Sequence, residues 1–588
     1  KKNDVSDPYN YRPISFVNSI TKLFTSILYN RLITWVESRG LIPQEQMGFR
    51  RGRGCGDAIF ALAGAISINL RLKRTHVFGT FVDLKRAFDS VPHAQLWSKL
   101  NGLGLNGKLL RVVMSFYNGT NIVISQGDSY SSEIPFTQGV LQGEILSPLL
   151  FALYICDLVC FFDSNGALGV DIASNKSLNM ILYADDIVML SSTRNDAQCQ
   201  LNLLEKYCQL WVLTVNVDKT VVLPFQRGSR LGEIKHLFYK SSRLNFVKKF
   251  TYLGVVFTSS LKFRTACEES IKKFNIAKSL VINILRNCKS DTWSTKVRLF
   301  ESLAESVLLF VSEVWACDYS DQIERGQIRF LKTILGLART TPDSYVRVET
   351  GRIHTKWKIF KRMINWYIKL LNMDSDSLTK IIYNRMAELV DINLIYNWCC
   401  TFKSYLISID KLEILNIQSS SQLVRIKNDL IESFKNYLIS KDIEFVMNSS
   451  FNLHFRFCSS LTFGEEYLLN NRCHINKIRI FAQLRLLNKK YPSLYLNLKK
   501  YKFFPDSLCS LCALNHKDNI YHFLFYCNKL DKLREKYLAK YINFSLVSNE
   551  EYVSMETLFY NSDFNKINDI YLYVLKGLEV RAINCLNN

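Results

Sequence analysis

Hydrophobic and polar positions follow two different patterns along the chain. Up to about residue 261, short apolar runs of strand length, such as "VFGTFVDL" and "MILYADDIVML", alternate with longer stretches whose apolar residues recur at helical spacing. From about residue 262 strand signals are rare, and amphipathic stretches such as "CEESIKKFNIAKSLVINILRN" predict helices through about residue 450. The pattern therefore predicts an α+β portion built around a small sheet, followed by a mostly helical portion.

Three stretches of the first portion give specific predictions. "SITKLFTSILYNRLITWVESRG" predicts a helix that ends at Gly40, a common stop residue. "NIVISQGDSYSSEIPFTQG" has the turn residues of a β-hairpin. "EILSPLLFALYICDLVCFF" is long enough for a buried helix, but its apolar run at 145–156 is too short to cross a bilayer and contains Pro148. We therefore expect no membrane span.

Length, charge and cysteine content indicate how many packed units, which kind of partner and which compartment to expect. A chain of 588 residues exceeds what one core usually serves, so several packed units are expected. The 75 basic and 52 acidic residues give a net charge of +23, which suits a large polyanion or simply a basic soluble protein. The 16 cysteines are scattered and no secretory signal opens the chain, which favours a reducing compartment. Because the first residue is Lys, we expect a fragment or a processed chain.

Two adjacent carboxylates lie in the middle of the apolar stretch 180–190. Asp185 and Asp186 have no glycine beside them, although tight hairpin turns favour Asn-Gly or Asp-Gly. Two like charges held together repel each other unless a cation lies between them. Asp83 ends another apolar strand, and three carboxylates at the ends of adjacent strands would hold two Mg²⁺ ions about 4 Å apart. The structural alternatives are a polar turn for the pair and a helix N-cap for Asp83.

A dense Cys/His cluster lies near the C-terminus. Cys509, Cys512, His522 and Cys527 have the spacing C-x2-C-x9-H-x4-C, and three thiolates with one imidazole form a closed tetrahedral zinc site. His516 is a rival for the third ligand, although the gap between His522 and Cys527 favours His522. The alternative is a group of unligated core cysteines.

A basic and aromatic segment precedes this cluster. Nine Lys or Arg residues and no acid lie between Arg472 and Phe504, interleaved with aromatic residues. Cations follow phosphates and rings stack on unpaired bases, so the segment predicts a nucleic-acid surface. The alternative is an amphipathic helix whose aromatic residues face the core. The predicted contacts are Arg472, Lys477, Arg479, Arg485, Lys489 and Lys490.

Five stretches together resemble a known family. "FVDLKRAFDSV", "QGVLQGEILSPLLF", "YADDIVML", "NVDKTVV" and "FTYLGVVF" resemble, in order and spacing, the palm motifs of reverse transcriptases. "DPYNYRPISFVNSITKLFTSILYNRL" and "EQMGFRRGRG" resemble the fingers of non-LTR (LINE-type) retrotransposon enzymes, of the jockey-like or a related group. The resemblance covers at least residues 4–352 and resumes at the Cys/His cluster.

The resemblance implies an α+β right-hand polymerase with a C-terminal zinc knuckle. The implied parts are fingers at 1–75, a palm with part of the fingers at 76–261, a helical thumb at 262–340, a helical connector at 341–470, and a basic, zinc-bearing segment at 471–588.

It also assigns roles to residues of the palm. Asp83, Asp185 and Asp186 match the metal-binding carboxylates, the carbonyl of Leu84 matches a further ligand, and Asp89 matches a position outside the metal shell. Phe88 matches the aromatic gate against a 2′-hydroxyl, with an ordinary core residue as the alternative. Gln142 and Gly143 match the segment against the nascent base pair and template. Relatives carry Arg and Asp-Pro where this chain has Leu141 and Glu144-Ile145, which could alter template handling.

Roles outside the metal shell follow in the same way. Lys219 matches a lysine that protonates the departing pyrophosphate, with a solvated lysine as the alternative. Arg12, Arg50 and Arg53 are candidates to grip the triphosphate or the template backbone. Tyr252, Leu253 and Gly254 match the turn that supports the primer end.

The implied activity is RNA-directed DNA polymerisation by target-primed reverse transcription. It would use two Mg²⁺ ions, with Mn²⁺ as a substitute, one structural Zn²⁺, dNTPs, a template RNA and a primer in the target DNA. The expected location is intracellular, in the nucleus and in a cytoplasmic ribonucleoprotein, without a membrane. No endonuclease motif is found, so an N-terminal endonuclease would precede Lys1. The alternatives are an inactive or domesticated RNA-binding scaffold and a group II intron-type maturase.

Overall fold

The computed structural model describes most of the chain. The described residues are 11, 13–72, 76–105, 107–227, 235–288, 292–391, 397–452, 454–458, 464–469, 473–488, 490, 492–496, 499–512, 515–542, 551–560 and 563–586. The chain divides into two compact units. The first comprises Lys1–Ala266 with Lys369–Phe402, and the second comprises Cys267–Ile368 with Lys403–Asn588.

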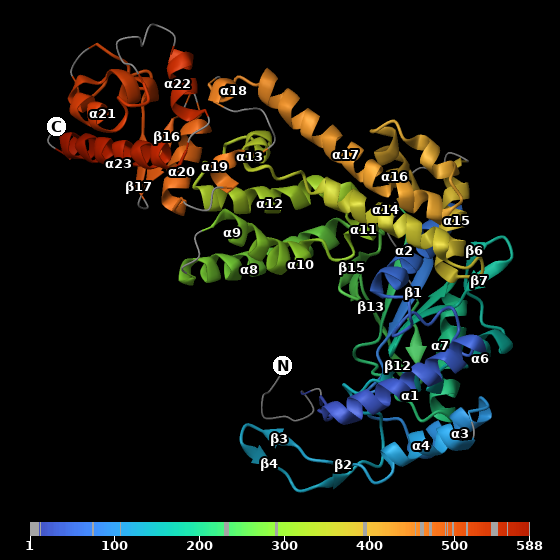
Figure 1. The fold of residues 1–588 in the computed structure, drawn as a ribbon. Coiled ribbons are helices and arrows are strands. Elements are labelled where there is room, and N and C mark those ends of the chain that lie inside the picture. The colour runs from blue at the N-terminus through green and yellow to red at the C-terminus, as the bar shows by residue number, and fades with distance from the viewer. Residues whose placement is uncertain are drawn as a thin grey trace. The chain divides into compact units, whose positions relative to one another are not determined.

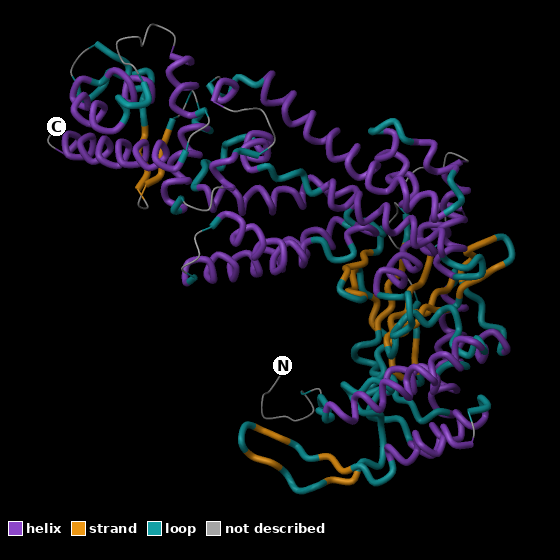
Figure 2. The backbone as a smooth tube through the Cα atoms, viewed as in Figure 1, coloured by secondary structure: helices purple, strands orange, loops and turns teal. Residues whose placement is uncertain are grey.

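The first unit combines a five-stranded sheet with helices (Figures 1 and 2). Its central strand is β1 (Val77–Val82), all six residues of which are buried. The strand order is β13-β10-β1-β9-β8. β1 is antiparallel to β9 (Asp186–Ser191) and to β10 (Val221–Phe225), and β8 (Met180–Tyr183) is antiparallel to β9 at one edge. This is the α+β arrangement that the alternating pattern predicts.

The other strands of the first unit pair into small two-stranded sheets, apart from β13 (Asn245–Phe246), which is parallel to β10. The hairpin expected after residue 120 is present as two nested pairs, β2 with β5 and β3 with β4. The remaining pairs are β6 with β7, β11 with β12, and β14 with β15. Their bounds are β2 (Asn121–Ile122), β3 (Ser125–Gln126), β4 (Ser129–Tyr130), β5 (Ile134–Pro135), β6 (Val170–Ala173), β7 (Lys176–Leu178), β11 (Phe238–Tyr239), β12 (Ser242–Arg243), β14 (Lys249–Tyr252) and β15 (Val255–Thr258).

Helices α2 (Cys55–Leu72) and α7 (Arg194–Leu210) pack on this sheet, and other helices of the first unit pack around them. The predicted first helix is α1 (Ser19–Ser38), which begins where Asn18 accepts the Thr21 N–H at 2.7 Å and is followed by Gly40 with φ +60°. The others are α3 (His93–Gly102), α4 (Gly107–Tyr117), α5 (Ser147–Tyr154), α6 (Leu158–Ser164) and α15 (Leu378–Asp391).

The apolar stretch after residue 144 forms two helices, α5 and α6, where the sequence predicts one. The break lies at Asp157, whose carboxylate pairs with the buried Lys99 and accepts the Tyr207 hydroxyl at 2.6 Å. Lys99 and Tyr207 thus compensate the negative charge of Asp157 at the point where the apolar stretch is interrupted. A charge in these apolar surroundings without such partners would be costly. Among the described residues, Ser147–Ser164 is the single stretch long and apolar enough to span a membrane, and 67% of it is buried inside the protein.

Residues 369–402, expected in the helical connector, pack within the first unit. Gly64 of α2 lets α15 approach closely, because a Cβ there would lie 2.4 Å from Cγ2 of Ile382. Asp57 accepts a hydrogen bond from Nζ of Lys369 at 2.6 Å. The sequence did not predict this placement because the contacting residues, such as Asp57 and Lys369, are far apart in the sequence. Helical periodicity indicates a helix but not its partners.

The second unit is helical, as predicted, with one described hairpin of β16 (Ser493–Leu496) and β17 (Lys499–Lys502) (Figure 2). Helices α8 (Arg264–Asn287), α14 (Lys356–Asn372) and α16 (Trp398–Ile407) cross the sequence boundaries between the units. The other α-helices are α9 (Trp293–Leu299), α10 (Ser306–Leu308), α11 (Ser312–Trp315), α12 (Ser320–Leu335), α13 (Asp343–Thr350), α17 (Ser420–Asn448), α18 (Phe455–Cys458), α19 (Glu466–Leu469), α20 (Ile475–Arg485), α21 (Asp531–Tyr537), α22 (Glu551–Phe559) and α23 (Phe564–Leu586). Shorter helical turns are η2 (Phe300–Glu305), η3 (Cys317–Tyr319), η4 (Leu412–Asn416), η5 (His522–Tyr526) and η6 (Asn528–Leu530).

Candidate active site and zinc centre

The sheet register brings two of the predicted metal-binding carboxylates together. β1 and β9 pair from Phe78 opposite Ser191 to Val82 opposite Ile187, so the next residues in register are Asp83 and Asp186. Residues directly opposite in an antiparallel pair share a face, with Cβ atoms about 5 Å apart. Asp83 is half-buried and Asp186 is exposed. The two carboxylates therefore lie at one end of the sheet and are open to a ligand.

A tight hairpin turn adds the third carboxylate. Tyr183 pairs with Asp186, which leaves Ala184 and Asp185 as a two-residue turn between β8 and β9. Ala184 has φ +55°, in the left-handed region that two-residue hairpin turns require at their first position. The turn holds Asp185 next to Asp186 and hence near Asp83.

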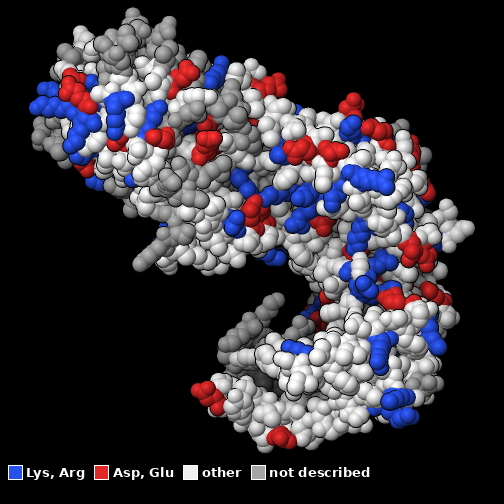
Figure 3. Space-filling view, in the orientation of Figure 1, with Lys and Arg blue, Asp and Glu red and all other residues white. Residues whose placement is uncertain are grey.

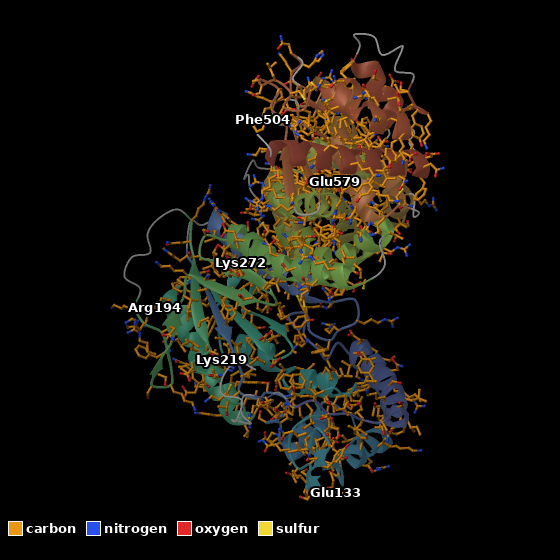
Figure 4. The ribbon with its side chains drawn as sticks, turned by 90° about the vertical axis from the view of Figure 1, so that its left-hand side faces the viewer. Glu133, Arg194, Lys219, Lys272, Phe504 and Glu579 are labelled. Carbon is orange, nitrogen blue, oxygen red and sulfur yellow. The ribbon has the colours of Figure 1, made fainter. Side chains whose placement is uncertain are left out.

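The loop that contains Lys219 is bonded to the end of β1. The Asn216 N–H donates to the Asp83 carbonyl at 2.7 Å, and the Asp83 N–H donates to Oγ1 of Thr220 at 3.2 Å. Nζ of Lys219 lies 3.8 Å from Oδ2 of Asp83, with 70% of the lysine side chain exposed (Figure 4). Residues more than 130 positions apart in the sequence are thus held at the same site.

The predicted primer turn also reaches this site. Leu253 and Gly254, with φ +45° and +86°, connect β14 to β15. Burial raises the pKa of Tyr252 well above its ordinary value, and the nearby negative charge of Asp186 raises it further. The ring centroids of Phe250 and Tyr252 lie 4.4 and 5.8 Å from that of Phe81, so the β14–β15 hairpin packs against β1, the strand that Asp83 follows.

The glutamine-glycine pair is tied to the segment that follows Asp83. Nε2 of Gln142 donates to Oδ1 of Asp89 at 2.8 Å. The ring of Phe88 stacks on Phe151, with centroids 4.7 Å apart, and remains half-exposed. Gly143 has φ +108°, and a Cβ there would lie 3.0 Å from the Ser15 carbonyl oxygen, which only a glycine accommodates readily. Asp89, predicted to lie outside the metal shell, therefore orients Gln142, a role that only the contact between them reveals.

Arg50 and Arg53, two of the arginines predicted to lie in the fingers, bind other protein groups. Arg50 donates to the Pro43 carbonyl at 3.0 Å and to Glu37 at 3.1 Å, and its side chain is 10% exposed. Arg53 donates to Oε1 of Gln44 at 2.9 Å, and burial lowers its pKa. Arg12 lies outside the described residues. Phosphate gripping by these arginines stays a prediction.

The Cys/His cluster converges as its spacing predicts. One ligand atom from each of Cys509, Cys512, His522 and Cys527 lies within 4.8 Å of all the others, and all four residues are buried. Tetrahedral zinc with Zn–S bonds of about 2.3 Å separates two sulfurs by about 3.8 Å, so the donors are close enough for one ion. Nε2 of His522 lies 3.3 Å from Sγ of Cys512, which identifies the ring nitrogen that faces the thiols.

His516 stacks beside this cluster without joining it. Its ring centroid lies 5.1 Å from that of His522, and its side chain is exposed. Burial lowers the pKa of His522, and the neighbouring His516 lowers it further, which favours the neutral ring that can ligate a metal. Burial raises the pKa of Cys527 to about 12, and the neighbouring Cys509 raises it as well. Thiols crowded in this way favour a cation that stabilises their thiolates.

The basic segment requires one correction. Arg485 was predicted to contact nucleic acid, but it is 1% exposed and donates from Nε to Oε1 of Glu349 at 2.7 Å. Its Nη2 also pairs with Glu465 at 2.8 Å. Burial alone would lower the pKa of Arg485, but the two carboxylates outweigh it and raise the pKa. The prediction was wrong because a buried guanidinium needs buried acids, and the segment itself contains none.

The other predicted tail contacts have mixed environments. Arg479 donates to the Ile334 carbonyl at 2.7 Å, Lys477 lies 5.2 Å from the Phe564 ring centroid, and Lys490 is exposed. Arg472 and Lys489 lie outside the described residues.

Exposed cations of the second unit also lie on β17, which is part of the basic segment, and around α21. Figure 3 shows Lys and Arg over α21 and α23. The exposed lysines of these two regions are Lys499, Lys500 and Lys502 of β17 and Lys529, Lys532, Lys536 and Lys540 in and around α21.

Comparisons with known proteins agree with this geometry. Residues 1–257 match the family model described as reverse transcriptase (RNA-dependent DNA polymerase). The chain is 25% identical over 327 residues to "Probable RNA-directed DNA polymerase from transposon BS" of Drosophila melanogaster, covering 55% of this chain and 35% of that protein. It is 26% identical over 343 residues to the RNA-directed DNA polymerase from mobile element jockey of Drosophila funebris, covering 56% and 36%.

The chain thus matches about a third of the length of these relatives. A structure of apo telomerase from Candida tropicalis, 14% identical, overlaps 61% of this chain and 60% of its own with a TM-score of 0.29, too low to establish a shared fold. Residues 1–257 are therefore a reverse transcriptase domain, of the kind found in the non-LTR (LINE-type) retrotransposon proteins that this chain matches.

Proposed function

We propose that the chain is an RNA-directed DNA polymerase that extends a DNA 3′ end on an RNA template, releasing pyrophosphate. The observation that carries the proposal is that Asp83 and Asp186 directly follow the last pair of the β1–β9 ladder, Val82 opposite Ile187, with Lys219 at 3.8 Å from Asp83. Asp185 precedes Asp186 in the turn. The proposed parts of the hand are fingers at 1–75, a palm at 76–261 and a thumb at 262–340. In the cell the primer would be nicked target DNA and the template the element's own RNA.

The carboxylates fit divalent cations. Asp83, Asp185 and Asp186 offer hard oxygen donors, which are the ligands that Mg²⁺ prefers in proteins. Two Mg²⁺ ions, or Mn²⁺ in their place, would be held by these residues and by the Leu84 carbonyl. When bound, they would supply the charge that favours attack by the primer hydroxyl and departure of pyrophosphate.

Other residues would position the reactants. Lys219, with its ammonium group beside the site, would donate a proton to the departing pyrophosphate. Phe88 stacks on Phe151, and its exposed edge would exclude a ribose 2′-hydroxyl. Gln142, held by Asp89, would contact the nascent base pair, and the turn of Tyr252, Leu253 and Gly254 would support the primer end.

The second unit would bind nucleic acid through a zinc-stabilised fold. One structural Zn²⁺ would be held by Cys509, Cys512, His522 and Cys527, which would form the proposed zinc knuckle. The distances of at most 4.8 Å between their ligand atoms support this proposal. The exposed lysines of β17 and α21 would contact phosphates of the template RNA or target DNA. We propose an intracellular location, in the nucleus and in a cytoplasmic ribonucleoprotein, since both substrates are met there.

A primer-extension assay with the full chain tests the proposal. On an RNA template with Mg²⁺ and dNTPs, the wild type is expected to extend a DNA primer, and Asp185→Asn is expected to abolish extension while retaining the melting temperature. Asp163→Asn, a change outside the metal site, serves as the matched control. Extension by Asp185→Asn at the wild-type rate would overturn the enzyme assignment. RNA binding without extension by the wild type would favour an RNA-binding scaffold instead.

A further inference from the structure

A buried glutamine of the fingers segment holds the turn that carries the two adjacent aspartates. Gln46 is only 1% exposed. It contacts Ala184, which lies 138 positions further along the sequence. Its Oε1 accepts the Ala184 N–H at 2.9 Å, and its Nε2 donates to the Ala184 carbonyl at 3.4 Å. Both hydrogen-bonding groups of the Ala184 main chain are thus bound by one carboxamide.

The segment around Gln46 extends the sheet beyond its edge strand. The Leu182 N–H donates to the Glu45 carbonyl at 2.9 Å, and the Met47 N–H donates to the Leu182 carbonyl at 2.8 Å. Gln46 therefore runs parallel to β8 and is paired with Leu182. At the point where β8 ends, its side chain continues the hydrogen bonding that the backbone begins.

Gly48 closes this contact. Its N–H donates to Oε1 of Gln46 at 3.0 Å, which fixes the carboxamide from the other side. A Cβ at Gly48 would lie 2.3 Å from the Ala184 nitrogen, so only a glycine permits the approach. The two main-chain N–H groups on Oε1 leave the amide one orientation, with Nε2 toward the Ala184 carbonyl.

The bonds act on a conformation that alanine rarely adopts. Ala184 has φ +55°, and a Cβ disfavours this left-handed region. Ala184 is the first residue of the turn, so its conformation sets the direction in which the chain leaves β8 and reaches Asp185. A turn free to relax would change the position of Asp185 relative to Asp83 and Asp186.

We propose that Gln46 is a positioning residue for the polymerase reaction: by clamping Ala184, it sets Asp185 and Asp186 for divalent cations. The inference rests on the proposed function for its catalytic consequence, but the clamp itself does not. Groups behind metal ligands typically change metal affinity or activity by 10- to 100-fold when they are removed.

Gln46→Met, which keeps the side-chain length and removes the hydrogen bonds, tests the proposal in the full chain. The Mg²⁺ concentration for half-maximal primer extension is expected to rise about tenfold. Hydrogen exchange of the segment 180–190 is expected to accelerate. Adding Ala184→Gly to this variant is expected to recover part of the Mg²⁺ affinity, because glycine adopts the left-handed conformation without a clamp.

Gln200→Met is the matched control. Gln200 is also 1% exposed, and its Nε2 donates to the Leu168 and Leu190 carbonyls at 3.0 and 2.9 Å. Its removal is expected to lower the melting temperature without changing the Mg²⁺ requirement. If Gln46→Met behaves like this control, or if Ala184→Gly recovers nothing, Gln46 only fills the core and the proposal is overturned.

A second variant and the hydrogen-exchange measurement cover the cases in which Gln46→Met does not fold or the wild type is inactive. Should Gln46→Met fail to fold, Gly48→Ala displaces the same contact and is expected to raise the Mg²⁺ requirement. Ala184→Gly is not expected to relieve Gly48→Ala, because the clash there is with a backbone nitrogen. Should the wild type fail to extend any primer, the proposed function fails, while unchanged exchange at 180–190 in Gln46→Met would separately refute the clamp.

Discussion

Nζ of Lys219 lies 3.8 Å from Oδ2 of Asp83, so the loop after α7 reaches the carboxylate that ends β1. The backbone of this loop is fixed to β1 by the bond from Asn216 to the Asp83 carbonyl. The lysine is thus held near the site by the main chain and not merely by an exposed ion pair, which contributes little to stability. The position of Lys219 beside Asp83 is therefore better explained by a role in the reaction than by a contribution to stability.

Lys219→Ala is therefore expected to slow catalysis without unfolding the protein. General acid catalysis is worth about 10²- to 10⁴-fold, so single-nucleotide incorporation should fall by about 100-fold in kcat, with a small change in KM. Rapid-quench incorporation measures both. The control is Lys206→Ala, a change of an exposed lysine of α7. A wild-type kcat in Lys219→Ala would return this residue to the role of a solvated lysine.

The carboxylates of the candidate active site could be predicted from the sequence, but the partners of the charged residues Arg485 and Asp157 could not. Asp83 and Asp186 could be predicted because strand ends and motif order are local patterns, and the sheet register brought them together. The environment of Arg485 could not, since its partner Glu349 lies 136 positions away. Similarly, the break at Asp157 depends on Lys99, and hydrophobic periodicity contains no information on such partners.

Arg485 is expected to govern the stability of the second unit. Arg485→Met would leave the buried Glu349 and the partly buried Glu465 without this cation, and breaking a buried pair costs about 3–5 kcal/mol. Urea unfolding of the full chain should show this loss in the transition of the second unit. RNA affinity of the folded variant should stay near the wild-type value. Weaker RNA binding at unchanged stability would instead restore Arg485 as a nucleic-acid contact.

The zinc site is expected to bind one ion with a strong dependence on pH. Since burial raises the pKa of Cys509 and Cys527, the thiols hold their protons in the absence of metal, and binding releases them. With about three protons released per ion, affinity should fall steeply as the pH is lowered. Competition with a chromophoric chelator at pH 6.5, 7.5 and 8.5 measures the slope.

Metal analysis of the purified chain supplies the control. The wild type is expected to contain about one zinc per chain and Cys512→Ser much less, with a lower melting temperature. Cys317→Ser, which alters a buried thiol outside the cluster, should retain the zinc. Equal zinc contents in the two variants would contradict the assignment of the ligands.

His454 is expected to make the second unit less stable in weak acid. Nε2–H of the neutral ring donates to the Leu484 carbonyl at 3.1 Å, and Nδ1 accepts the Tyr521 hydroxyl at 3.3 Å. Burial lowers the pKa of His454 to about 4, against about 6.5 for an exposed histidine. The unfolded chain therefore binds a proton first, and the stabilisation present above pH 6.5 is lost as the pH falls toward 4.

The size of this loss follows from the two pKa values. Between pH 8 and pH 5 the unfolding free energy should decrease by about 2 kcal/mol through this group. Because other groups titrate in the same range, the informative quantity is the difference between the wild type and His454→Gln, measured by urea unfolding at both pH values. Glutamine does not titrate, so the variant should lose about 2 kcal/mol less than the wild type over this interval. Parallel losses in the two proteins would show that His454 is protonated equally in the folded and unfolded states, contrary to its burial between Leu484 and Tyr521.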